Sequence, residues 1–115
     1  MSGSYKELTH DISKLLMPFR KEAQAPMAGF DAMAKSAMAD GVLSALQKEL
    51  IATGIAVSTR CDGCIGFHVR SLVKLGATRE QINEMLAVAV YMGGGPSLMY
   101  AAEVLRAWEE FSAQS

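Results

Sequence analysis

Residues 44–76, SALQKELIATGIAVSTRCDGCIGFHVRSLVKLG, decide the fold of this chain. A Ser/Gln capping box at the start of the stretch predicts a helix over 45–60. A second helix is expected to begin at Cys61 or Asp62 and to end at Gly76, a residue type that commonly follows the last turn of a helix. This helical pair contains both cysteines of the chain and one of its two histidines.

The rest of the chain carries the same helical signals. Apolar residues recur at helical spacing, and no stretch shows the strict alternation expected of a strand. Proline and capping residues mark the helix starts. The further helices are expected over 4–20, where Pro18 kinks or ends the helix early, from Pro26 to about 40, from Thr78 to the glycines at 93–95, and from Pro96 onward. The sequence therefore predicts an all-α bundle of about six helices.

Length and composition limit the class of protein. With 115 residues and 12.3 kDa, the chain is expected to be a single domain over 1–115. Half of its residues are hydrophobic, which excludes a disordered chain, and two cysteines are too few for a disulfide-stapled mini-protein. Eleven basic and twelve acidic residues give a net charge of −1, so no nucleic-acid partner is expected.

No membrane or secretory segment is expected. The polar N-terminus lacks the apolar core of a signal peptide. Residues 85–102 are uncharged and about as long as a membrane span, but Gly-Gly-Gly-Pro at 93–96 divides them into two helix ends. We therefore expect a cytoplasmic protein with reduced thiols, in which a cysteine pair indicates catalysis or metal binding before a structural staple.

The apolar content exceeds what one small core can hide, so a homo-oligomer is expected. Two features offer contact surfaces. One is the methionine-rich second helix, with Met27, Met33 and Met38. The other is the glycine turn at 93–95 together with the helix that follows it.

The candidate chemistry lies in Cys61-Asp62-Gly63-Cys64 and in His68. On a helix, positions 61, 64 and 68 share one face. Unpaired backbone N–H groups and the helix dipole at the N-terminus favour a thiolate there. A thiol, a base one turn away and a second thiol that can close a disulfide together make a redox centre.

Glu49 is the fourth candidate, and helix geometry gives its position. If the second helix folds back antiparallel to the first, Glu49 lies ~16–18 Å from the turn, Cys64 ~4.5 Å and His68 ~10 Å. Glu49 is then too far from the cysteines to touch them, but close enough to His68 for a proton relay bridged by water. The predicted catalytic set is therefore Glu49, Cys61, Cys64 and His68.

This pattern resembles the motif of the AhpD-like alkylhydroperoxidases of the carboxymuconolactone decarboxylase superfamily. Eleven residues separate Glu49 from Cys61, two separate the cysteines, and three separate Cys64 from His68. The resemblance continues through 67–70, 75–82 and 91–96 and covers roughly residues 40–108. It implies an all-helical fold that reduces a hydroperoxide through the cysteine pair, with Glu49 and His68 moving protons. It also implies a dithiol reductant of the lipoyl type, or a peroxiredoxin partner, in antioxidant defence.

Three departures qualify the resemblance. Some alkylhydroperoxidases have a histidine just before the second cysteine, where this chain has Gly63. Larger members contain two copies of the helical unit, and this chain has the length of one, so the short members suggest a hexamer built from dimers. The decarboxylases that give the superfamily its name generally lack the cysteine pair, which argues against lactone decarboxylation.

We expect Cys64 to attack the peroxide, because His68 is its i+4 neighbour, and Cys61 to resolve the sulfenic acid. The reverse assignment stays open, since the first cysteine of such a motif is usually the more exposed. A zinc site is a rival interpretation that needs a fourth ligand, such as His10 or a carboxylate. We expect neither a metal nor a cofactor. The alternative functions are a carboxymuconolactone-decarboxylase-type enzyme and a non-catalytic, redox-responsive oligomeric protein.

Overall fold

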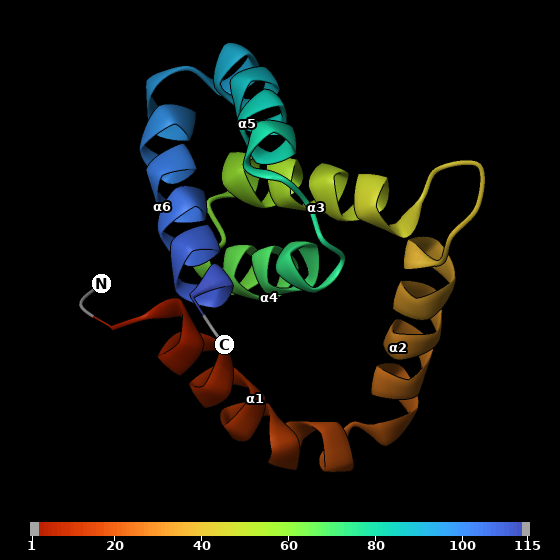
Figure 1. Ribbon diagram of the computed structural model, residues 1–115. Helices are drawn as coiled ribbons and strands as arrows, with labels where there is room; N and C mark the ends of the chain where they lie inside the picture. The colour runs from red at the N-terminus through yellow and green to blue at the C-terminus, as the bar shows by residue number, and fades with distance from the viewer. Residues whose placement is uncertain (1–2, 114–115) are drawn as a thin grey trace.

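Six helices make up the fold in the computed structural model, which describes residues 3–113 (Figure 1). They are α1 (Tyr5–Glu22), α2 (Gln24–Met38), α3 (Ala45–Thr59), α4 (Asp62–Lys74), α5 (Arg79–Gly93) and α6 (Gly95–Ser112). No strand occurs in the described range, so the predicted all-α fold is confirmed. None of the helices between residues 3 and 113 is both long and apolar enough to cross a membrane.

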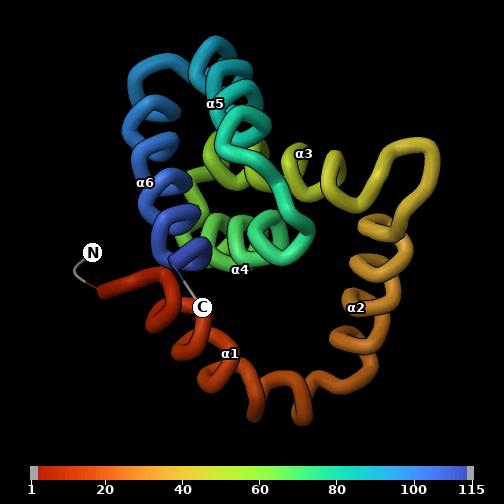
Figure 2. Tube along the Cα trace, viewed as in Figure 1, coloured from red at the N-terminus to blue at the C-terminus, as the bar shows by residue number. Residues whose placement is uncertain are grey.

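Helix α4 lies at the centre of the bundle. It packs against α1, α3 and α6, and α5 packs across α3 and α6 (Figure 2). On α4, Ile65, Val69 and Leu72 follow helical spacing and are fully buried. They meet apolar side chains from the neighbouring helices, including Val57, Ile82 and Val104. Every functional group on α4 is therefore held by a helix that is packed on several sides.

The connection from α3 to α4 is a tight reversal. Arg60 adopts the left-handed conformation, with φ 56° and ψ 49°, which few residues other than glycine take up. Its N–H donates to the carbonyl of Val57 (3.2 Å), and the N–H of Cys61 donates to that of Ala56 (3.1 Å). This is the Schellman arrangement, which satisfies the free carbonyls at a helix end. It lets α4 begin two residues later.

The first half of α1 is anchored on α4. Tyr5 is fully buried, and Thr9 is nearly so. The two helices approach closely because α4 presents Gly66 to α1: a Cβ at this position would lie 2.7 Å from Cγ2 of Thr9 and 3.2 Å from Cδ1 of Tyr5. The glycine is thus a packing requirement, although a glycine inside a helix is unfavourable in itself.

The structure rules out one of the two effects expected of Pro18 and shows how far the apolar residues of α1 are buried. Pro18 does not end α1, which continues to Glu22, because a proline removes one helical hydrogen bond while the capping box at Ser4 and the packing around Tyr5 hold the start of the helix. The apolar residues of α1 are only partly buried: Leu8 packs on the core, whereas Leu15 is 76% exposed. Helix α2 has no buried residue and extends away from the bundle (Figure 1).

We predict opposite effects for two glycine-to-alanine substitutions. Gly66→Ala should lower the free energy of unfolding by about 1–3 kcal/mol, because the methyl group collides with Thr9 and Tyr5. Gly29→Ala should raise it by about 0.5–1 kcal/mol, because Gly29 is inside α2 with no atom within 4 Å of the added Cβ. Urea denaturation at one fixed protein concentration measures both. Equal effects would show that α1 and α4 are not in close contact.

Candidate functional site

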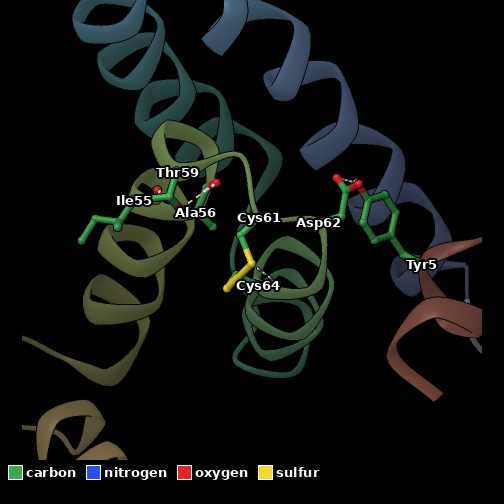
Figure 3. Close-up of a disulfide and its surroundings, with 7 residues drawn as sticks. All are labelled: Tyr5, Ile55, Ala56, Thr59, Cys61, Asp62 and Cys64. Atoms are coloured by element: carbon green, nitrogen blue, oxygen red, sulfur yellow. Dashed lines mark hydrogen bonds between the residues drawn. A yellow bond between two sulfur atoms is a disulfide. The ribbon is translucent and has the colours of Figure 1, made fainter. Parts of the chain in front are cut away.

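The two cysteines form a disulfide at the start of α4 (Figure 3). Cys61 is the N-cap residue and Cys64 lies in the first turn, with 5.2 Å between their Cα atoms. The reversal at Arg60 places this turn beside the end of α3. The sulfur atoms therefore lie where the N–H groups of α4 have no carbonyl partner within the helix.

The two sulfur atoms have different surroundings. Cys64 is exposed, whereas Cys61 is partly buried. The backbone N–H of Cys64 donates a hydrogen bond to Sγ of Cys61 at 3.2 Å. Such a bond favours negative charge on the Cys61 sulfur. An attacking molecule reaches Cys64 more easily, and Cys61 is the sulfur better prepared to leave as a thiolate.

His68 and Glu49 are in direct contact. Nδ1 of His68 lies 2.7 Å from Oε1 of Glu49, and their side chains are 33% and 13% exposed. When Glu49 is ionised its carboxylate can only accept hydrogen bonds, and the proton of this bond then lies on Nδ1. This pairing fixes the ring and leaves Nε2 available for another partner.

An apolar pocket of about 220 Å³ joins Cys64 to His68. The other lining residues come from one face of α3: Ala52, Ile55, Ala56 and Thr59. Figure 3 shows three of them, Ile55, Ala56 and Thr59, on the part of α3 that lies beside the disulfide. The pocket therefore presents a sulfur and an imidazole to the same small volume, with little polar surface around them.

The predicted set of four residues is therefore found together, with one correction. We expected a water molecule between Glu49 and His68, and the side chains touch instead. The rise along the helices alone leaves out the reach of the two side chains. From the helix ends at Thr59 and Asp62, the axial offset of the two residues is roughly 6 Å. A glutamate and a histidine side chain together span this offset across two packed helices.

Gly63 lies against α1. A Cβ at this position would lie 2.9 Å from Cδ1 of Ile12 on α1. A larger residue at position 63 would require the end of the Ile12 side chain to shift. The departure from the family pattern noted in the sequence thus accompanies the close packing of α1.

His10 does not complete a metal site with the cysteines. It lines a separate hollow with Lys6 and Arg70. Among residues 3–113, no group of three or more His, Cys, Asp and Glu side chains could hold a metal ion.

Sequence reasoning missed Tyr5, whose hydroxyl group lies 3.3 Å from Oδ1 of Asp62 between the two cysteines and 3.0 Å from Oε1 of Glu103. The helical periodicity of residues 4–20 includes Leu8 and Ile12 but not Tyr5, and nothing in the sequence links α1 to the cysteine turn.

Comparisons with known proteins agree with this architecture. Residues 24–107 match the sequence profile of the carboxymuconolactone decarboxylase family. The crystal structure of apo-lpg0406, a carboxymuconolactone decarboxylase family protein from Legionella pneumophila, superimposes with a TM-score of 0.92 and 56% sequence identity. The match covers 94% of this chain and 96% of that chain.

Two curated relatives are similar in sequence. An uncharacterized protein of Cupriavidus necator is 37% identical over 113 residues, which are 98% of this chain and 100% of the relative. Uncharacterized protein 4 in the cox locus of Paracoccus denitrificans is 40% identical over 81 residues, or 70% of this chain and 73% of the relative.

Proposed function

The chain belongs to the carboxymuconolactone decarboxylase family, and we propose that it is a thiol peroxidase of the alkylhydroperoxidase type. One observation carries the proposal. The exposed Cys64, which is bonded to Cys61, lines the same apolar pocket as His68, and the Glu49 carboxylate holds the His68 ring. The apolar lining suits the carbon chain of an organic hydroperoxide.

In the first step, the Cys64 thiolate attacks the terminal oxygen of the hydroperoxide. A sulfur–oxygen bond forms as the oxygen–oxygen bond breaks, and the departing alkoxide takes a proton to leave as the alcohol. His68 is placed to supply this proton at the pocket, and Glu49 stabilises the charged ring. The sulfur is oxidised to a sulfenic acid as the peroxide is reduced.

In the second step, the Cys61 thiolate attacks the Cys64 sulfur. The hydroxide group leaves and is protonated to water, which produces the disulfide. A dithiol reductant then attacks the exposed Cys64 sulfur, and Cys61 leaves as a thiolate that accepts the N–H of Cys64. Exchange with the second thiol of the reductant, a lipoyl-type dithiol, restores both cysteines and oxidises the reductant. A peroxiredoxin partner would accept electrons from the reduced cysteine pair.

We predict distinct outcomes for the two cysteines. A peroxide pulse should lower the intact mass of the reduced protein by two hydrogens, and dithiothreitol should restore it. Cys64→Ser should abolish peroxide turnover, whereas Cys61→Ser should leave a sulfenic acid that dimedone traps. Turnover that survives either substitution would contradict a two-thiol mechanism, and dimedone labelling only in Cys64→Ser would reverse the roles.

We predict that Glu49 and His68 act as one unit. Glu49→Gln should reduce the rate of peroxide reduction on the order of a hundredfold, because the charge that stabilises the protonated ring is lost. His68→Asn should cause similar damage, and the double variant should be little worse than either. Glu80→Gln, at an exposed carboxylate on α5, is the control and should keep full activity. Multiplicative losses in steady-state peroxide assays would show independent roles.

We propose that the protein works as a homo-oligomer of six subunits. The chain exposes 7323 Å², whereas a monomer of this mass exposes about 6,100 Å². The excess of exposed surface over that of a typical monomer is larger than the roughly 800 Å² that one partner buries in a standard interface. An apolar groove of about 360 Å³ between α3 and α5 supports this, and Ile55 lines both this groove and the pocket beside Cys64 and His68.

Light scattering at micromolar concentration should report a discrete oligomer of six subunits. Leu98→Glu should dissociate it, because Leu98 is 52% exposed on α6 in a single subunit and a charge there cannot be buried in a contact. Ser112→Glu, at the exposed end of the same helix, should leave the assembly intact. A monodisperse monomer of the unmodified protein would contradict the proposal.

A further inference from the structure

The cysteine turn contains a charge that works against its chemistry. Asp62 lies between Cys61 and Cys64 and is the first residue of α4. A carboxylate beside a thiol disfavours the thiolate and raises the pKa of that thiol. The direction in which the Asp62 side chain points therefore affects how reactive the cysteines are.

The Asp62 carboxylate points away from the sulfur atoms. Figure 3 shows it directed toward Tyr5, on the side of the turn opposite to the disulfide. Oδ1 of Asp62 lies 3.3 Å from the Tyr5 hydroxyl oxygen, and it shares the single proton of that group with Oε1 of Glu103 at 3.0 Å. Among residues 3–113, Tyr5 is the one hydrogen-bonding partner of this side chain.

Tyr5 is itself held on several sides. It is fully buried, its backbone N–H donates to Oε1 of Glu110 at 2.6 Å, and the Arg106 guanidinium lies 4.6 Å from the centre of its ring. Burial, reinforced by the hydrogen bond to Glu103, raises the pKa of Tyr5 above its usual range, so the phenol keeps its proton. Glu103 also accepts from Arg106 at 2.8 Å and does not depend on Tyr5.

We propose that Tyr5 is a positioning residue for the thiols, because its hydroxyl group holds the Asp62 carboxylate on the far side of the turn from Cys64. The inference rests on the proposed thiol chemistry, and it adds an element that the catalytic set lacks. The titratable and charged groups around the turn are then Arg60 at the end of α3, Asp62 and His68 on α4, Glu49 in contact with His68, and Glu103 with Arg106 on α6. Of these, Asp62 is the one that loss of the Tyr5 hydroxyl group sets free.

The test first removes the Tyr5 hydroxyl group, which tethers Asp62, and then the charge of Asp62. Tyr5→Phe keeps the ring in the core and frees Asp62 to rotate toward the sulfur atoms. The pKa of Cys64, taken from the pH dependence of iodoacetamide alkylation of the reduced protein, should rise by roughly half a unit to one unit. Peroxide reduction at neutral pH should slow by about three- to tenfold, because one pKa unit changes the thiolate fraction tenfold.

The second substitution identifies the cause. In Tyr5→Phe/Asp62→Asn the pKa of Cys64 should return to the value in the unmodified protein or below it, because the freed group carries no charge. Tyr100→Phe is the matched control: Tyr100 lines the hollow shared by Asp62 and Glu103, and its loss should leave the pKa of Cys64 unchanged.

Two results would overturn the proposal. One is a Tyr5→Phe variant that is less stable to urea yet has an unchanged pKa of Cys64, which would make Tyr5 purely structural. The other is a raised pKa that persists in the double variant, which would exclude Asp62 as the cause. Alkylation needs no peroxide turnover, so the predicted pKa pattern in a protein without peroxidase activity would refute the proposed function and support the tether.

Discussion

The reversal of the chain at Arg60 and Cys61 is the constraint on which the site depends. Two backbone hydrogen bonds close α3 there, and α4 starts at the next residue. The brevity of the turn has two consequences. It sets the axial register of the two helices, so Glu49 meets His68. It also places the sulfur atoms where α4 presents its unpaired N–H groups and the positive end of its dipole. With a longer loop, the register that brings Glu49 to His68 would no longer follow from the position of the sulfur atoms at the start of α4.

The sequence predicted those features that depend on short-range chemistry. The capping box Ser44–Gln47 is present as expected, because it involves residues three positions apart. The neighbourhood of Glu49 and His68 was also predictable, because helix rise is constant. Their direct contact was not, because it depends on how far two side chains reach across a helix pair.

Features that depend on distant residues gave no such signal. Tyr5 and Asp62 are 57 positions apart, and neither pattern nor capping links them. The same holds for Gly66, whose meaning comes from the residues of α1 that lie above it. Periodicity shows which residues share a face, but not what covers the face. Leu15 and Phe30 have helical spacing typical of a core, yet they are exposed in the single subunit.

Asp62 combines a benefit and a cost in one side chain. A carboxylate in the first turn of a helix interacts favourably with the helix dipole, which typically contributes about 0.3–1 kcal/mol. The same charge opposes a thiolate at Cys64. The two effects differ in their dependence on direction: the dipole acts over the whole first turn, whereas the repulsion depends on the separation of carboxylate and sulfur. A tether that points the carboxylate toward Tyr5 therefore retains the benefit to the helix and reduces the cost to the thiol. Under the proposed chemistry, this separation accounts for an acidic residue between two reactive cysteines.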